Sequence, residues 1–181
     1  MRIRTEQIKE AGRHYTFSEP ASAFPVLDEM EKAGECRFYS SVAVELTAAK
    51  EMDCYRITGS LSVPVGLCCS RCLADFEQTL SSRFTFFFHE SKYNEQPDEE
   101  ELELAEQDLV SVTFQGDEID LLPEIGEQAA LSIPLKPLCS DLCKGLCPVC
   151  GADNNKEACN CGQSLEFSKF SALRNFKVNS N

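Results

Sequence analysis

A cysteine-rich stretch near the C-terminus constrains this chain more than any other feature of the sequence. Six cysteines lie within residues 139–161, interspersed with turn-forming and polar residues. Cys147 and Cys150 are separated by two residues, so one tight turn can direct both sulfur atoms at a single metal ion. Pro148 fixes φ in that turn, and Gly151 can adopt the positive φ that points backbone amides toward the thiolates. This knuckle predicts a structural zinc site, and disulfide bonds are the competing interpretation.

Eight of the eleven cysteines form four local pairs. The pairs are Cys69 and Cys72, Cys139 and Cys143, Cys147 and Cys150, and Cys159 and Cys161. A compact division places the last two pairs on one Zn²⁺ and the first two on another. A rival division places pairs 69/72 and 147/150 on a single Zn²⁺ and leaves the others free. Either cross-link closes a loop of about 70 residues, where a metal clip offsets the most chain entropy. The sequence therefore predicts one or two structural Zn²⁺ sites among these eight ligands.

The pair Cys69 and Cys72 occupies a turn between two predicted strands, and three interpretations compete for it. The first is half of a zinc site that distant cysteines complete. The second is a redox dithiol, although such a motif usually opens a helix after a strand of a βαβ unit. The third is a pair of inert core thiols. We favour the first interpretation. Three further cysteines, Cys36, Cys54 and Cys68, are expected to be free thiols in the core or near the surface.

The charge distribution argues against direct binding of RNA or DNA. The formal net charge is −13, and residues 90–127 contain fourteen acidic residues and one basic residue. The remainder of the chain contains sixteen residues of each sign. Non-specific binding to phosphates depends on clustered lysine and arginine, and the chain has no long basic stripe. The acidic band at 90–127 suits a basic protein partner, or it serves solubility alone.

The remaining sequence signals indicate a cytoplasmic protein without enzymatic activity. No run of 18 apolar residues exists, and the first ten residues lack the apolar region of a secretory signal. Eleven cysteines in a reducing compartment are expected to hold metal rather than to form disulfides. His14 and His89 lie far from the cysteine pairs in sequence, so we expect neither a catalytic zinc nor a small-molecule substrate. No phosphate-binding glycine loop or nucleophile motif is present.

Hydrophobic periodicity predicts an α+β fold. Alternating apolar residues over 37–90 indicate three strands of an antiparallel β-meander, which forms a curved sheet or a partial barrel. Residues 1–36 are expected to hold a strand, a loop and a short helix over 26–32. The core continues to residue 134 and includes an acidic linker at 91–108. A zinc-ribbon-like, cysteine-rich segment with a C-terminal helix occupies 135–181.

Two further elements are expected within the second half of the chain. Residues 110–114 read as a short strand. A helix near 120–133 follows, with Asp120 as its candidate N-cap and Pro123 in its first turn. In the C-terminal segment, apolar residues recur every three positions from Phe167 to Phe176, which indicates an amphipathic helix. We expect that helix to dock on the core, with partner binding as the alternative.

Four motifs together resemble the bacterial YceD family, whose members are called large ribosomal RNA subunit accumulation proteins. They are Cys-Ser-Arg-Cys-Leu at 69–73, Glu-Ile-Asp-Leu-Leu at 118–122, Leu-Ser-Ile-Pro-Leu-Lys-Pro-Leu-Cys at 131–139 and Cys-Lys-Gly-Leu-Cys-Pro-Val-Cys-Gly at 143–151. The motifs follow the family's order, and the resemblance covers about residues 37–176. Two separated Cys-x-x-Cys pairs recur in that family, and they match 69/72 and 147/150 here.

The resemblance implies a role in accumulation or processing of the 23S ribosomal RNA precursor and in assembly of the large ribosomal subunit. We expect the partner to be a basic ribosomal protein or a ribosome-assembly factor. Any association with pre-ribosomal RNA is expected to be indirect, and no contact with membranes is expected. Two functions of other classes compete with this one. A zinc-ribbon nucleic-acid-binding module predicts affinity that falls steeply with salt. A thiol redox or zinc-storage protein predicts thiols of low pKa that exchange metal readily.

Overall fold

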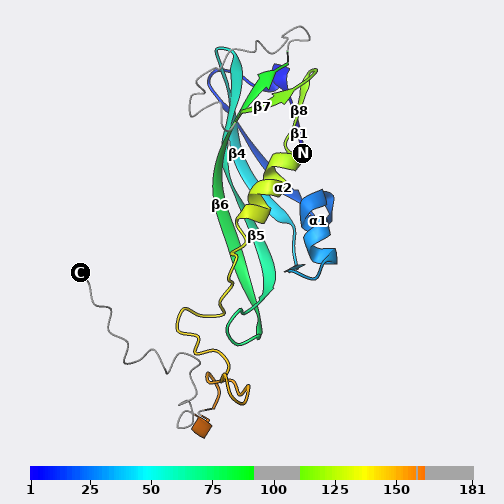
Figure 1. Ribbon diagram of the computed structural model, residues 1–181. Helices are drawn as coiled ribbons and strands as arrows, with labels where there is room; N and C mark the ends of the chain where they lie inside the picture. Colours follow the sequence, from blue (N-terminus) through cyan, green and yellow to red (C-terminus); the bar gives the residue numbers. More distant parts are fainter. Residues whose placement is uncertain (92–110, 158, 162–181) are drawn as a thin grey trace, which may run out of the picture. The chain divides into compact units, whose positions relative to one another are not determined.

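The computed structural model describes residues 1–91, 111–157 and 159–161 (Figure 1). The chain divides into two compact units. The first consists of Met1–Leu67 and Phe76–Leu135, and the second of Cys68–Asp75 and Lys136–Asn181. Each unit is therefore assembled from two separate stretches of sequence. The predicted linker at 91–108, apart from its first residue, and the predicted C-terminal helix lie outside the described residues.

The first unit contains most of the regular secondary structure. In chain order the elements are β1 (Arg2–Arg4), η1 (Thr5–Gln7), β2 (Arg13–Glu19), η2 (Ala21–Ala23), α1 (Pro25–Lys32), β3 (Arg37–Phe38), β4 (Val42–Glu51), β5 (Cys54–Cys68), β6 (Asp75–Glu90), β7 (Ser111–Phe114), β8 (Glu118–Asp120) and α2 (Leu122–Leu131). The protein is thus mostly β-sheet with two α-helices. None of the helices in the described ranges is long and apolar enough to cross a lipid bilayer.

The main sheet has the order β2-β4-β5-β6-β7, and β3 pairs with β5 beside it. Strands β4, β5 and β6 lie side by side in chain order, as the predicted meander requires, and β4 pairs antiparallel with β5. Two features differ from the prediction. Strand β2 extends the sheet on one side, and β7 pairs parallel with β6, with Val112 opposite Phe88. The sheet remains open in the described part of the chain, so it is not a closed barrel.

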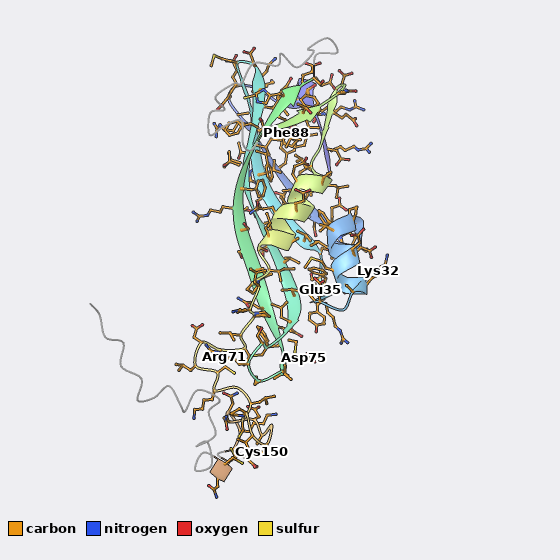
Figure 2. All side chains as sticks on the ribbon, in the orientation of Figure 1. Lys32, Glu35, Arg71, Asp75, Phe88 and Cys150 are labelled. Atoms are coloured by element: carbon orange, nitrogen blue, oxygen red, sulfur yellow. The ribbon has the colours of Figure 1, made fainter. Side chains whose placement is uncertain are left out.

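One face of the sheet forms the core of the first unit. Every second residue of β4 from Val42 to Ala48 is buried, because successive side chains of a strand point to opposite faces. Phe88 of β6, labelled in Figure 2, is only 1% exposed, and Ile125 and Ala129 of α2 belong to the same buried cluster. Helix α2 thus provides the apolar cover for this face of the sheet (Figure 1).

The N-cap of helix α2 lies one residue later than the sequence predicts, and the helix ends at Leu131, two residues before the predicted end. Leu121 occupies the N-cap position. The Asp120 carboxylate still accepts a hydrogen bond from the backbone N–H of Leu122, at 3.1 Å, and so stabilises the first turn. Helix α1 matches the predicted helix over 26–32 and begins one residue earlier, at Pro25.

A small two-stranded sheet joins the start of the chain to β8. Strands β1 and β8 are antiparallel, with Arg2 opposite Asp120 and Arg4 opposite Glu118. The same residues form ion pairs, at 3.3 Å between Arg2 Nε and Asp120 Oδ2 and 3.2 Å between Arg4 Nε and Glu118 Oε1. Two acidic residues of the 90–127 band are therefore paired with arginines within the fold, and the sequence pattern did not predict these pairs.

Candidate metal centres

Eight cysteines of the second unit gather into two groups of four. Group one comprises Cys69, Cys72, Cys139 and Cys143, and group two comprises Cys147, Cys150, Cys159 and Cys161. Within each group all sulfur atoms lie within 4.8 Å of one another. These groups correspond to the compact division of the four pairs and not to the rival one. The two halves of group one come from two distant stretches of sequence, whereas the four cysteines of group two lie close together in sequence.

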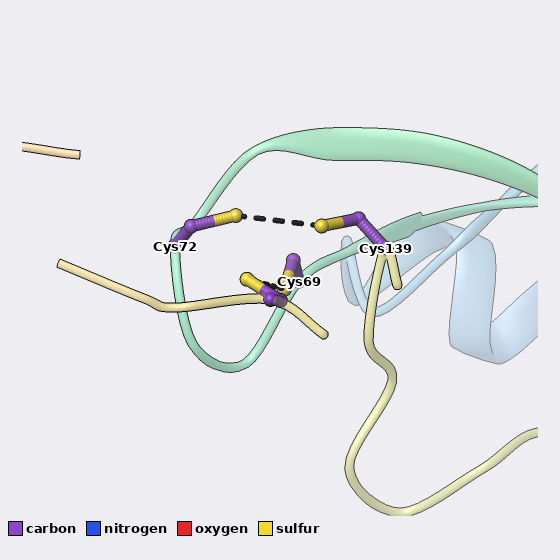
Figure 3. Close-up of side chains that lie close together, drawn as sticks. Cys69, Cys72 and Cys139 are labelled. Atoms are coloured by element: carbon purple, nitrogen blue, oxygen red, sulfur yellow. Dashed lines mark hydrogen bonds between the residues drawn. The ribbon is translucent and has the colours of Figure 1, made fainter. Parts of the chain in front are cut away.

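The spacing in group one suits a tetrahedral ion. The Sγ atoms of Cys69 and Cys143 lie 3.8 Å apart, and those of Cys72 and Cys139 lie 3.7 Å apart (Figure 3). Four thiolates placed about 2.3 Å from a central Zn²⁺ at tetrahedral angles are separated by about 3.8 Å from one another. The two distances match the edges of that tetrahedron.

The turn between β5 and β6 positions the first half of group one. The backbone N–H of Cys69 donates to the carbonyl of Ala74, and the N–H of Leu73 donates to the carbonyl of Cys69, each at 2.9 Å. Leu73 adopts a φ of 58°, in the left-handed region, which closes the knuckle. The N–H of Ser70 donates to the carbonyl of Pro137 at 2.8 Å. This last bond attaches the turn to the segment that carries Cys139.

Arg71, labelled in Figure 2, clamps the second half of group one against the first. Its guanidinium donates to the backbone carbonyls of Cys143 at 3.0 Å and Asp141 at 3.3 Å. Its own carbonyl accepts the N–H of Leu146 at 3.0 Å. Gly145 has a φ of +71°, and a Cβ there would lie 3.0 Å from the Arg71 carbonyl oxygen. A glycine is required at this close approach of the two segments.

Hydrogen bonds to sulfur make the thiols of group one chemically unequal. Backbone N–H groups, first that of Cys139 and then those of Cys72 and Arg71, lower the pKa of Cys69 to about 6. The hydrogen bond with the Cys72 sulfur, together with burial, raises the pKa of Cys139 to about 12. Without a metal ion, neighbouring N–H and S–H groups stabilise the thiolate form of Cys69. A cation with thiolate affinity would replace the remaining protons.

Group two is built on a short hairpin that follows group one directly. Leu146 and Asp153 form an antiparallel bridge, and the Cys147 N–H donates to the Ala152 carbonyl at 2.7 Å. The N–H groups of Cys150 and Val149 lower the pKa of Cys147 to about 6. The hydrogen bond with the Cys150 sulfur raises the pKa of Cys161 to about 12. Group two thus repeats the chemistry of group one on a local scaffold.

The donor sets of both groups fit a structural zinc ion. Four sulfur donors around one point select soft or borderline ions such as Zn²⁺. Within the described ranges, no histidine or carboxylate joins either group. Catalytic zinc sites usually combine three protein ligands with an exchangeable water, which differs from these two sets. Both groups can therefore hold a metal ion in a closed site.

The two groups differ in their exposure to solvent. In group one, Cys69, Cys72 and Cys143 are buried and only Cys139 is exposed. In group two, only Cys147 is buried. The other three cysteines of the chain belong to neither group: Cys36 is buried, Cys54 is half-buried and Cys68 is exposed. His14 and His89 also lie outside both groups.

Comparison with known proteins gives one matching family and several relatives. The sequence model described as large ribosomal RNA subunit accumulation protein YceD matches residues 57–177, more than half of the chain. The large ribosomal RNA subunit accumulation protein YCED homolog 1, chloroplastic, of Arabidopsis thaliana is 24% identical over 155 residues, which cover 75% of this chain and 48% of that protein. Its Zea mays counterpart is 26% identical over 141 residues, covering 66% and 48%.

Another relative is an uncharacterised protein of Mycobacterium bovis, 32% identical over 95 residues that cover 52% of this chain and 42% of that protein. The chain spans about half the length of the curated plant relatives that it matches. No solved structure is significantly similar to it.

Proposed function

This chain belongs to the YceD family of large ribosomal RNA subunit accumulation proteins, and on that premise we propose that it is a non-enzymatic, cytoplasmic factor in assembly of the large ribosomal subunit. It supports accumulation and processing of 23S ribosomal RNA by contacting a basic ribosomal protein or an assembly factor. Each of the two cysteine groups binds one structural Zn²⁺. The observation that carries this proposal is family membership over a region that contains both groups.

The proposed zinc role rests on the composition and geometry of the two groups. Each offers four sulfur atoms within 4.8 Å of one another, and the S–S distances in group one match those around a tetrahedral zinc ion. In this proposal the ion of group one links the turn between β5 and β6 to the segment that begins at Lys136. The ions therefore act on the fold and do not take part in chemistry.

The proposed protein partner rests on charge. The chain carries a formal net charge of −13, and a negatively charged surface repels phosphates while it attracts basic proteins. Many ribosomal proteins are basic because they contact RNA. Two acidic residues of the band already form ion pairs within the chain, since Asp120 pairs with Arg2 and Glu118 pairs with Arg4. The acidic residues outside these pairs are the ones that we assign to the partner.

Depletion and complementation in cells that carry the gene test the proposal. Loss of the protein should lower the ratio of large to small ribosomal subunits and leave 23S precursor unprocessed. The wild-type chain should restore both, whereas a chain with Cys69→Ser and Cys147→Ser, which damages both groups, should not. Unchanged 23S levels on depletion would contradict the proposed role in large-subunit assembly.

A direct binding assay separates the protein-contact mechanism from RNA binding. The purified full chain is titrated with individual basic ribosomal proteins and, in parallel, with 23S ribosomal RNA fragments. The mechanism predicts binding to a protein and no measurable affinity for the naked fragments at physiological salt. Binding to the RNA fragments alone, with affinity that decreases steeply as salt rises, would instead support a nucleic-acid-binding zinc module.

A further inference from the structure

The two cysteine groups share backbone and are tied to each other by hydrogen bonds. Cys143 of group one and Cys147 of group two are separated by only three residues. Those residues contact both sides: the N–H of Leu146 donates to the Arg71 carbonyl, and the carbonyl of Gly145 accepts the N–H of Asn154, both at 3.0 Å. The hairpin that supports group two is therefore hydrogen-bonded to the turn that supports group one.

One side chain of the group-two hairpin reaches a sulfur atom of group one. The Nδ2 atom of Asn155 donates to the Sγ of Cys143 at 3.3 Å and to the Oδ1 of Asp153 at 2.8 Å. The Oδ1 atom of Asn155 accepts a hydrogen bond from the backbone N–H of Lys144 at 2.8 Å. Because the Lys144 N–H can meet only an acceptor, the orientation of the carboxamide is fixed by its partners. Only an asparagine offers this set of donors and acceptors in a side chain of this length.

The position of Asn155 depends on closure of group two. Asn155 lies in the segment between Cys150 and Cys159, two cysteines that a metal ion in group two would hold together. Within that segment Asp153 organises the turn: its Oδ1 accepts the N–H of Asn155 at 3.0 Å, and its carbonyl accepts the N–H of Lys156 at 3.0 Å. If group two opened, both ends of this segment would be released and the Asn155 amide would leave Cys143.

We propose that the two cysteine groups bind their metal ions cooperatively and that Asn155 is the positioning residue that couples them. The inference rests on the proposed function, since it assumes that both groups hold metal. A hydrogen bond from the amide stabilises the charge on the Cys143 thiolate and orients the ligand, so it increases the affinity of group one for the ion. Because binding free energies are linked reciprocally, a metal ion in group one also favours binding in group two.

A double-mutant cycle on the full chain tests this coupling. Zn²⁺ is titrated in competition with a chromophoric chelator into four proteins: wild type, Asn155→Asp, a Cys159→Ser/Cys161→Ser variant that opens group two, and the combination of all three substitutions. Opening group two in the wild-type background should lower the affinity of group one for Zn²⁺ about tenfold, the size typical for loss of an outer-shell partner. In the Asn155→Asp background, the same opening should change that affinity less than about twofold.

Asn155→Asp is nearly isosteric and removes both amide donors, so it isolates the hydrogen bonds from the volume of the side chain. Asn160→Asp is the matched control. Asn160 lies between Cys159 and Cys161, is exposed, and makes no side-chain hydrogen bond to the described residues, so the control introduces the same charge beside group two. It should leave the coupling at its wild-type value.

A spectroscopic readout covers the case in which Asn155→Asp weakens folding. The protein is loaded with ¹¹³Cd²⁺, whose NMR resonance reports the electron density of the coordinating sulfurs. Asn155→Asp should shift the resonance of group one, which contains Cys143, more than that of group two. Asn160→Asp should reverse this order.

The outcomes distinguish this inference from the proposed zinc role. Two bound ions with a tenfold coupling that disappears in Asn155→Asp support the inference. Two ions that bind independently, or a coupling of equal size with and without Asn155, overturn it and leave the proposed zinc role intact. A chain that binds no Zn²⁺ overturns both.

Discussion

The Sγ atoms of Cys69 and Cys143 lie 3.8 Å apart, although 74 positions separate the two residues along the chain. The contact joins the turn between β5 and β6 to the segment that follows α2, and these two stretches together make up the second unit. Among the described residues of this unit, the buried hydrophobic residues are all cysteines. In the described part of the chain, this unit therefore has sulfur at its centre where the first unit has aliphatic and aromatic side chains.

Metal content provides the first prediction. The purified wild-type protein should contain two Zn²⁺ per chain, and Cys143→Ser should retain only one, because group one then lacks a ligand. Cys68→Ser is the matched control, since Cys68 is exposed, adjoins Cys69 and belongs to neither group. It should retain both ions. Elemental analysis of desalted protein measures the result, and a loss of zinc in Cys68→Ser equal to that in Cys143→Ser would contradict the assignment of ligands.

Removal of metal should loosen the second unit and leave the first intact. Structural zinc sites contribute on the order of 10 kcal/mol of binding energy to folding, whereas the sheet of the first unit has its own apolar core. After treatment with a chelator, the backbone amides of Ser70 and Cys147 should exchange with deuterium much faster than before. Both amides donate hydrogen bonds within the second unit. The amides of β4 should keep their protection, and equal loss of protection in β4 would show that the two units unfold as one.

The affinity of group one for Zn²⁺ should decrease as the pH is lowered. The pKa of Cys69 is lowered to about 6 and that of Cys139 is raised to about 12, so near neutral pH Cys69 is mostly thiolate while Cys139 is a thiol in the metal-free protein. Zn²⁺ must displace the protons that remain, and affinity therefore falls as pH falls, by about tenfold per pH unit for each displaced proton. Below about pH 6, Cys69 also binds a proton and the decrease becomes steeper.

Zinc retention against a fixed chelator, measured from about pH 8 to about pH 5 and corrected for protonation of the chelator, checks this dependence. Affinity that stays constant over this interval would be inconsistent with thiol ligands. The Cys68→Ser variant should follow the wild-type curve, because its sulfur contributes no ligand in our assignment.

A substitution in the sheet tests the packing of the first unit. Gly59 in β5 lies opposite Leu46 in β4, and a Cβ at position 59 would lie 2.4 Å from the Glu45 carbonyl oxygen and 2.7 Å from the Leu46 Cβ. Gly59→Ala should therefore lower the free energy of unfolding by about 1–3 kcal/mol, the cost of forcing extra volume into a packed site. The neighbouring exposed Ser60, changed to Ala, should alter it by less than about 0.5 kcal/mol. Urea denaturation followed by circular dichroism measures both, and a Gly59→Ala midpoint equal to that of the wild type would refute the close contact.

Local periodicity was sufficient to predict the long elements of the first unit. Strong alternation marked β4 and β5, and an apolar stripe with an early proline marked α2. Strand β2 was missed because it contains no fully buried residue, so its alternation of polar and aromatic side chains is weak. The pairing of β1 with β8 was missed for a different reason. Each strand has three residues, and a pairing across more than a hundred positions leaves no local pattern.

The candidate site likewise has a part that the sequence predicts and a part that only the tertiary structure shows. Short spacings identified the four cysteine pairs, because two ligands on one turn must be close in sequence. Which pairs meet depends on tertiary contacts such as the Ser70–Pro137 hydrogen bond and the Arg71 clamp on Cys143, and spacing does not encode these. Asn155 carried no signal at all, since a polar residue in an asparagine-rich loop is ordinarily a turn residue.

The different origins of the two groups fix an order of events on the translating ribosome. Translation proceeds at about 5–20 residues per second, so Cys139 and Cys143 are synthesised roughly 4–15 s after Cys69 and Cys72. All four cysteines of group two emerge within a span of fifteen residues, from Cys147 to Cys161. During that wait, the thiols of the β5–β6 turn are available to cellular oxidants and to competing metal ions. Under the proposed zinc role, the distant arrangement of group one makes synthesis of the chain the stage at which zinc supply should matter most for this group.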